Sequence, residues 1–215
     1  MGTEATIELD GEYRQLREEA GFVRRPSVRT LAVTGPDAVD FLQGQLTNDV
    51  EALEAGGGGY GALLDRKGHL QSDLRALRVG DEAVWLVAEV DGAERVAGHL
   101  GMYRIGREVE VQPVDVEAIS VLGPAGAATT GIDPPSSEHA HLETEVAGVG
   151  GVRAVATDLG IDLLVASGEV EPLTSALVAA GVPEASEEAA EILRVESGRP
   201  RLGFDMTSES GRTVN

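Results

Sequence analysis

The stretch Leu31-Ala32-Val33-Thr34-Gly35-Pro36-Asp37 returns in the second half of the chain as Ile119-Ser120-Val121-Leu122-Gly123-Pro124-Ala125. The two copies are separated by a constant offset of 88 residues, since 119 − 31 = 88. In each copy an apolar run predicts a strand, and the proline that follows the glycine suits the first turn of a helix. A second echo, between residues 85–88 and 163–166, places a further strand and helix in each half. The pattern predicts an α+β fold made of two duplicated split β-α-β units with antiparallel sheets.

The composition restricts the class of partner. The 215 residues include 37 Asp and Glu against 17 Lys and Arg, which gives a formal net charge of −20. A surface this negative repels phosphate backbones, so we expect no direct nucleic-acid binding. Lys67 is the single lysine. Surplus acid with almost no lysine is expected of a halophilic protein that works in molar salt, and a GC-rich genome that favours arginine codons is the alternative.

Two further absences in the sequence narrow the function. There is no cysteine, which excludes disulfides, thiolate metal sites and cysteine nucleophiles in these residues. Apolar runs are much shorter than a membrane span, and the acidic start at 1–10 is unlike a signal peptide. We therefore expect a cytoplasmic protein with no membrane partner.

Two motifs suggest ligand sites, but their sequence context favours structural roles. Gly56, Gly58 and Gly61 match G-x-G-x-x-G, yet the predicted order is helix, glycines, strand, whereas a dinucleotide site needs a strand before the glycines and a helix after them. A flexible lead-in to a hairpin is the better interpretation. The residues at 138–143 include two histidines and two glutamates, but they follow a Pro-Pro-Ser-Ser loop at 134–137. We predict a solvated loop there and assign no metal.

Three polar residues within apolar elements are the candidates for chemistry. Asp73 lies in a predicted strand and shares its parity with polar neighbours, which places it on the face opposite Leu74; it is either a site residue or a solvent-facing carboxylate paired with an arginine. Asp162, in the predicted strand 161–165, has the same ambiguity. Arg194 lies in a predicted helix, where an i,i+3 pair with Glu191 is the structural alternative.

Three stretches of the sequence, in this order along the chain, resemble segments of a single protein family. Residues 41–50 read FLQGQLTNDV and resemble the opening motif of that family. Residues 60–68 read YGALLDRKG and match its hairpin. Residues 193–206 read LRVESGRPRLGFDM and resemble its LRIEAGxPRxGxDM segment. Together the three stretches resemble the YgfZ/GcvT family of tetrahydrofolate-binding proteins. The resemblance covers about 22–207, and the motif residues are more similar to the YgfZ branch than to the glycine-cleavage T-protein.

This resemblance implies a folate-binding domain of ferredoxin-like units, with tetrahydrofolate or a one-carbon derivative as the ligand. Its lobes would be about 22–115 and 116–207, followed by a polar tail at 208–215. Carried over by motif, Asp73 corresponds to the aspartate that faces the N5/N10 region, where it would be the catalytic acid or base. The other implied folate contacts are Tyr60, Asp162 and Arg194.

The sequence also departs from the family pattern. Glu89 stands where T-proteins have an asparagine, and Val155 stands where they have a tyrosine, which weakens an aminomethyltransferase assignment. Asp162 is one methylene shorter than the expected glutamate. YgfZ proteins continue into a cysteine motif and a C-terminal β-barrel, whereas this sequence stops at Asn215. We expect a natural short form, a remainder in another open reading frame, or a truncated chain.

Three functions follow as hypotheses. The first is a YgfZ-type folate-binding accessory protein in iron–sulfur enzyme maintenance. The second is an aminomethyltransferase that passes a one-carbon unit to tetrahydrofolate, as in glycine cleavage. The third is a non-catalytic remnant that binds a protein partner supplying the missing C-terminal domain.

Overall fold

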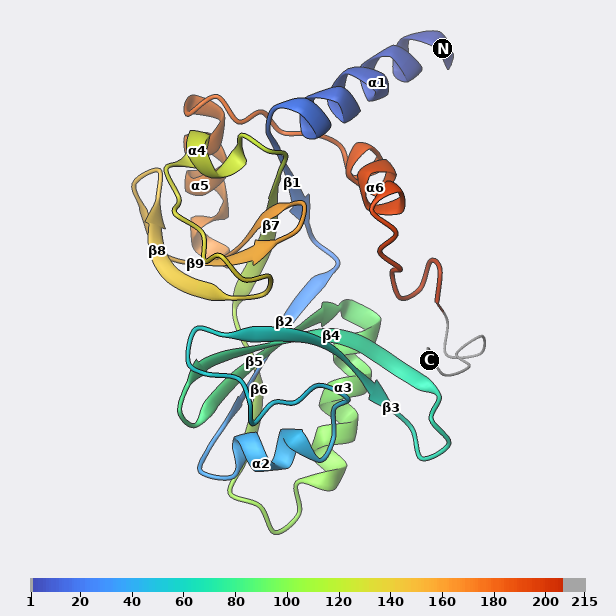
Figure 1. Cartoon of the computed structure of the whole chain (residues 1–215), viewed down its shortest axis with the longest axis vertical. Helices are drawn as coiled ribbons and strands as arrows, with labels where there is room; N and C mark the ends of the chain where they lie inside the picture. Colours follow the sequence, from blue (N-terminus) through green and yellow to red (C-terminus); the bar gives the residue numbers. More distant parts are fainter. Residues whose placement is uncertain (1, 207–215) are drawn as a thin grey trace. The chain divides into compact units, whose positions relative to one another are not determined.

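The structure, a computed structural model, describes residues 2–206 and divides into two compact units (Figure 1). Unit 1 contains residues 2–26 and 116–199, and unit 2 contains residues 27–115 and 200–206. Each unit is therefore built from two separate segments of the chain. The predicted polar tail at 208–215 lies outside the described residues.

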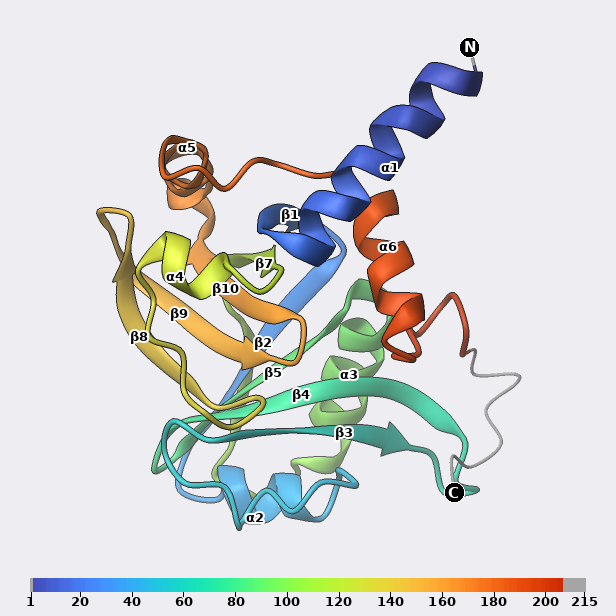
Figure 2. The same cartoon turned by 45° about the horizontal axis from the view of Figure 1, so that its top comes forward.

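Unit 2 is a five-stranded antiparallel sheet with the strand order β3-β4-β5-β2-β6. Its elements are β2 (Val28–Thr34), α2 (Ala38–Gln43), β3 (Gly58–Leu64), β4 (Leu70–Gly80), β5 (Ala83–Glu89), α3 (Val90–Tyr103) and β6 (Glu110–Pro113). The glycine run leads into β3, and β3 and β4 form a long hairpin (Figure 2). The predicted hairpin interpretation of the glycines is thus confirmed.

Unit 1 has a second five-stranded antiparallel sheet with the order β1-β7-β10-β9-β8. Its elements are α1 (Gly2–Glu18), β1 (Gly21–Arg25), β7 (Val116–Leu122), α4 (Gly126–Thr130), β8 (His141–Val146), β9 (Val149–Thr157), β10 (Gly160–Ala166), a 3-10 turn (Ser167–Glu169), α5 (Val170–Ala179) and α6 (Glu187–Glu196). Read from β8, the order 8-9-10-7 repeats the order 3-4-5-2 of unit 2. The predicted α+β fold with duplicated antiparallel units is therefore confirmed.

The fifth strand of each sheet has a different origin. In unit 2 it is β6, which follows α3 in the chain, whereas in unit 1 it is β1, which comes before the whole of unit 2. Residues 22–25, which the family resemblance assigns to the first lobe at about 22–115, thus pair in the sheet of the second half (Figure 1).

One face of each sheet carries the core because side chains alternate along a strand. In unit 2, Leu74 and Leu86 from the sheet pack in one cluster with Phe41 of α2 and Val96 and Leu100 of α3. The corresponding cluster of unit 1 joins strands β7, β9 and β10 to α5. A third cluster packs α1 and α6 against β1. In unit 2 the face of the sheet opposite α2 and α3 carries polar side chains of β4, among them Asp73 and Arg75.

One local prediction is corrected by the structure. The predicted solvated loop at 138–143 is wrong at its second half, because β8 begins at His141 and this side chain is buried. The pairing of His141 with Val155 on β9 draws the segment into the sheet. None of the helices within residues 2–206 combines the length and the apolar character that crossing a membrane requires.

Candidate functional site

The hairpin of β3 and β4 brings Tyr60 and Asp73 together on the face of the sheet opposite the helices. Tyr60 pairs in register with Arg75, and Ala62 pairs with Asp73. Tyr60 and Asp73 are therefore diagonal neighbours on one face, within reach of a long aromatic side chain. The Tyr60 hydroxyl donates a hydrogen bond to Asp73 Oδ2 over 2.8 Å. The parity predicted for Asp73 is confirmed, since Leu70, Ser72 and Leu74 are buried on the other face.

The turn of this hairpin is fixed by the carboxylate of Asp65. Asp65 Oδ1 accepts hydrogen bonds from the backbone N–H groups of Lys67, over 2.7 Å, and His69, over 2.9 Å. These bonds, the one from His69 foremost, lower the pKa of Asp65. A carboxylate that stays ionised and bonds the turn in this way holds β3 and β4 in one register.

The loop after α2 lies along the edge of β3 and positions Tyr60. Thr47 Oγ1 accepts from the N–H of Ala62 over 2.9 Å, and Asn48 Nδ2 donates to the carbonyl of Tyr60 over 3.0 Å. The side chain of Asn48 fits because the strand has glycines beside it: a Cβ on Gly61 would lie 2.8 Å from Asn48 Cβ, and one on Gly59 would overlap its amide. The stretch that resembles the family's opening motif thus holds the edge strand in place.

The surroundings of Asp73 shift the pKa of its carboxyl group above that of an ordinary aspartate. Burial raises the pKa of the Asp73 carboxyl, the hydrogen bond from Tyr60 opposes this, and the negative charge of Glu89 raises the pKa further. A carboxyl group with a raised pKa can both donate and accept a proton closer to neutral pH than an ordinary aspartate. The arrangement is chemically suited to general acid–base work.

Glu89 and Arg201 form an ion pair beside Asp73 that the sequence analysis did not assign to the site. Arg201 Nε donates to Glu89 Oε1 over 2.9 Å, and the side chains of Arg201 and Glu89 are 7% and 18% exposed. Arg201 also donates to Ser27 Oγ over 3.1 Å, and its guanidinium carbon lies 4.3 Å from the centre of the Phe204 ring. The motif PRLGFDM at 200–206 marked Arg201 as a residue of interest. Its pairing with Glu89 could not be read from the sequence, because 112 residues separate the two partners.

Asp162 lies on β10 in unit 1, on the face opposite its apolar core. Its carboxylate accepts a hydrogen bond from Ser120 Oγ over 2.6 Å. In register it pairs with Ser120 on one side and with Val155 on the other. The position where the family resemblance expects a tyrosine is therefore directly beside Asp162, and here it holds a smaller, apolar side chain.

Arg194 lies near the end of α6, and its side chain is 13% exposed. Its Nε and Nη2 donate to the Glu191 carboxylate over 3.0 and 2.5 Å. Its Nη1 donates to the backbone carbonyl of Arg199. The i,i+3 pair considered from sequence is thus present, although most of the Arg194 side chain is buried.

Of the four predicted site residues, the structure joins Tyr60 and Asp73 by a hydrogen bond. Asp162 and Arg194 belong to the other unit, where each has the partners just described.

The acidic and histidine side chains at 138–143 contact arginines. Glu138 pairs with Arg199, and both His141 Nδ1 and Glu143 lie 3.1 Å from Arg153. Over residues 2–206, no group of three or more His, Cys, Asp and Glu side chains is placed to hold a metal ion.

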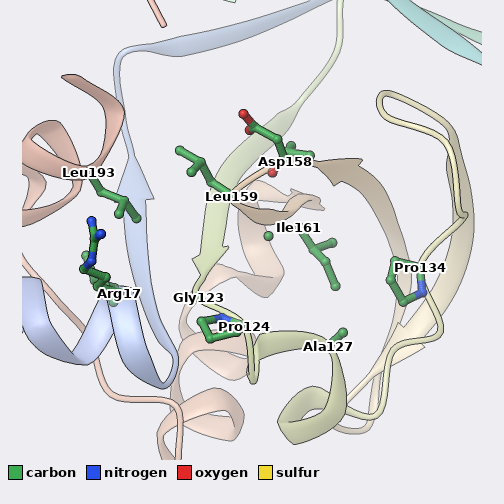
Figure 3. A pocket seen from close by; sticks show the side chains of 12 residues that line it. Arg17, Gly123, Pro124, Ala127, Pro134, Asp158, Leu159, Ile161 and Leu193 are labelled. Atoms are coloured by element: carbon green, nitrogen blue, oxygen red, sulfur yellow. The ribbon is translucent and has the colours of Figure 1, made fainter. Parts of the chain in front are cut away.

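A pocket of about 410 Å³ opens in unit 1, beside the turn of β9 and β10 (Figure 3). Its lining is mainly apolar, with Leu193 and Leu159 facing it, and Arg17 and Asp158 at its border. Both charged side chains are engaged in ion pairs, Arg17 with Glu196 and Asp158 with Arg199. None of the predicted site residues lines this pocket.

Comparison of the sequence with protein families gives a match over nearly the whole chain. The family model of the GCVT N-terminal domain matches residues 4–212. Among curated proteins, the aminomethyltransferase of Chloroherpeton thalassium is 26% identical over 226 residues, covering 97% of this chain and 62% of that protein. The aminomethyltransferase of a Thermus thermophilus strain is 27% identical over 209 residues, covering 93% and 60%. The chain therefore spans about three fifths of the length of these relatives.

The solved structures agree on the fold. The glycine cleavage system aminomethyltransferase T from Bartonella henselae matches with a TM-score of 0.84 at 23% identity, over 94% of this chain and 57% of that one. A heterotetrameric sarcosine oxidase from Corynebacterium sp. U-96 matches with a TM-score of 0.54 at 15% identity, over 82% of this chain and 92% of that one. The fold expected from the sequence resemblance is thereby confirmed.

Proposed function

Because the chain belongs to the family of the GCVT N-terminal domain, we propose that it binds tetrahydrofolate or a one-carbon derivative of it. The observation that carries the proposal is the hydrogen-bonded pair of Tyr60 and Asp73, in which a carboxyl group with a raised pKa is held on the face of the unit 2 sheet. Residues with perturbed pKa values concentrate at functional sites. The curated relatives named above are aminomethyltransferases, which supports a folate ligand.

In this proposal Asp73 is the catalytic residue and faces the nitrogens of the folate that carry the one-carbon unit. Its carboxyl group exchanges a proton with one of these nitrogens, or its carboxylate stabilises positive charge that develops there. The Tyr60 hydroxyl keeps the carboxyl in one orientation and contacts the ligand. Tetrahydrofolate supplies the nucleophilic nitrogen and the carrier of the one-carbon unit.

We also propose Asp162 and Arg194 of unit 1 as folate contacts, on the basis of the family resemblance. A carboxylate such as Asp162 accepts paired N–H donors of an aminopterin ring, and an arginine such as Arg194 binds carboxylate or carbonyl groups. For either to do so, a ligand would compete with the partners that they have now, Ser120 and Glu191.

The experiment that tests folate binding is a calorimetric titration with 5-formyl-tetrahydrofolate, in molar KCl and again at low salt. Asp73→Asn keeps the shape of the side chain and removes its charge, and Tyr60→Phe removes the hydroxyl. The matched control is Asp81→Asn, the same change at an exposed turn after β4. A hydrogen bond to a charged group contributes about 1.5–3 kcal/mol, so we expect Asp73→Asn to weaken binding about 10-fold or more.

The control variant should bind as the wild type does. Absence of binding by a folded wild-type protein in both salt conditions would refute the proposal. Equal affinities for wild type and Asp73→Asn would leave folate binding standing and remove Asp73 from the site.

We propose aminomethyl transfer to tetrahydrofolate as the reaction to assay first, since the curated relatives are named aminomethyltransferases. The assay mixes the protein with tetrahydrofolate and an aminomethylated, lipoylated carrier protein, and it measures methylene-tetrahydrofolate and ammonia. Formation of both, with a loss of about 10-fold or more in Asp73→Asn, is the expected result. Background rates in the wild type would rule this reaction out.

A YgfZ-type accessory role in iron–sulfur enzyme maintenance is the second candidate. The observation that favours it is Glu89, which replaces the asparagine expected of T-proteins and forms an ion pair with Arg201. Restoration of iron–sulfur enzyme activity in cells that lack their own YgfZ-type protein would support this role. Restoration by the wild type and equally by Asp73→Asn would show that it does not use the proposed folate site.

A further inference from the structure

The segment at 200–206 reaches the sheet of unit 2 and contacts it beside Asp73. Leu202 is buried, and its Cδ2 would lie 3.2 Å from a Cβ added at Gly92 of α3. The Asp205 carboxylate accepts from the backbone N–H of Arg201 over 2.9 Å, which closes the segment into a hook. The hook thus presents the Arg201 side chain to the sheet in one defined position.

We propose that Glu89 and Arg201 are positioning residues for Asp73: Arg201 binds Glu89 and offsets part of its negative charge, so that Asp73 can release its proton to the ligand as well as take one up. The role in folate chemistry rests on the proposed function, whereas the electrostatic part concerns this chain alone. The asparagine of T-proteins at this position would need no such counter-charge.

The strand geometry places the two carboxylates close together. Arg75 of β4 pairs with Val87 of β5 in register. Asp73 and Glu89 are each two residues further along in the same direction, so they occupy neighbouring positions on one face of the sheet. Like charges on neighbouring strands repel each other and destabilise the pairing, unless one of them is neutralised.

The position and contacts of Arg201 allow it to offset the negative charge of Glu89. Its side chain is 7% exposed and contacts Glu89 at both carboxylate oxygens, over 2.9 and 3.4 Å. The hydroxyl of Ser27 and the ring of Phe204 hold the guanidinium from two further directions. An arginine fixed on several sides loses little additional freedom in holding the carboxylate, which makes a buried pair of this kind effective.

The charge on Asp73 therefore depends on groups from several elements. Tyr60 reaches it from β3, Arg75 lies on its own strand, Glu89 lies on β5, and Arg201 comes from the hook. Removal of Arg201 would leave the Glu89 charge uncompensated and favour protonation of Asp73. Removal of the Glu89 charge would leave Arg201 positive and favour ionisation of Asp73.

The test is a carbon-13 NMR titration of the Asp73 carboxyl in aspartate-labelled protein without folate, with the resonance assigned by its loss in Asp73→Asn. We expect Arg201→Met to raise the pKa of Asp73 and Glu89→Gln to lower it, each by about one pH unit, the size typical of a charge a few ångströms away. The double variant should return the pKa towards the wild-type value. Glu82→Gln, at the exposed β4–β5 turn, is the control that should leave it unchanged.

The outcomes separate the inference from the proposed function. Equal Asp73 titrations in wild type, Arg201→Met and Glu89→Gln overturn the inference, whatever the protein binds. If Arg201→Met does not fold, the direction of the shift in Glu89→Gln decides, since that change keeps the shape of the side chain. Shifts of the Asp73 pKa in the expected directions, together with no folate binding, would uphold the effect of Glu89 and Arg201 on Asp73 and reject the folate role.

Discussion

Substitution of Gly35 by alanine should destabilise unit 2 strongly. Gly35 has φ +123°, a conformation that residues with a side chain rarely adopt. A Cβ there would overlap the carbonyl oxygen of Glu108 and lie 3.1 Å from its carbonyl carbon. Relief of this overlap would disturb the backbone bond from Asp37 to the Glu108 carbonyl, 3.4 Å long, and the bond from the N–H of Glu108 to the Asp37 carboxylate, 2.8 Å long.

The expected magnitude follows from these two costs. Backbone strain of this kind costs about 1–3 kcal/mol, and each disturbed hydrogen bond costs about 1 kcal/mol, so the loss should be about 3–5 kcal/mol. Gly106→Ala is the matched control: Gly106 has φ +80° but nothing within 4 Å of an added Cβ. It should therefore lose only the strain, about 1–2 kcal/mol.

The assay is urea unfolding monitored by Trp85, the single tryptophan, which lies on β5 of unit 2. With a slope of about 2 kcal/mol per molar urea, Gly35→Ala should lower the midpoint by about 1.5–2.5 M, and Gly106→Ala by less than about 1 M. Equal losses of unfolding free energy in the two variants would refute this explanation. The destabilisation would then come from the positive φ alone, and not from the close approach of the chain after β2 to Glu108.

Three further results are expected. Asn48→Ala removes the bond to the Tyr60 carbonyl and leaves a gap beside β3, so it should cost about 1 kcal/mol in urea unfolding and weaken folate binding as well; unchanged binding would disconnect the loop from the site. Asp73→Asn should melt at a higher temperature than wild type at pH 7, and the difference should vanish near pH 4. The reason is that the raised folded-state pKa of Asp73 contributes stability that is present below the unfolded pKa of about 3.9 and is lost as the pH rises through the folded-state pKa. A wild type that melts higher than Asp73→Asn at pH 7 would contradict this sign. Ser186→Ala removes the cap that accepts from the N–H of Ala189 at the start of α6 and should cost about 1 kcal/mol in urea unfolding, whereas no loss would mean that the cap contributes nothing.

The hairpin around Asp73 could be predicted from sequence because its physics is local. Alternation of apolar and polar side chains along 70–76 assigns Asp73 to the face opposite Leu74, and the turn at 65–68 sets the register. The contact between Tyr60 and Asp73 then follows from strand geometry. Duplication was predictable for the same reason, since the strand–Gly-Pro unit is a short pattern that occurs twice.

The features that sequence reasoning missed depend on contacts between distant segments. No local pattern in residues 21–25 predicts that this strand pairs with β7 rather than with a strand nearer to it in the sequence. Burial of His141 depends on its pairing with Val155, and the Glu89–Arg201 pair joins residues 112 positions apart. An arginine in a sequence shows its charge but not its counter-ion.

The position of β1 in the sheet has a consequence for folding during synthesis. Phe22 pairs with Val121, 99 residues later (121 − 22), and the continuous segment 27–115 of unit 2 lies between them. At about 5–20 residues per second, β1 leaves the ribosome roughly 5–20 s before its partner strand. All five strands of the unit 2 sheet are synthesised in that interval, while β1 is still without its partner strand β7. Arg24 and Arg25 at the end of β1 place positive charge on the waiting strand, which opposes its association with other exposed strand edges.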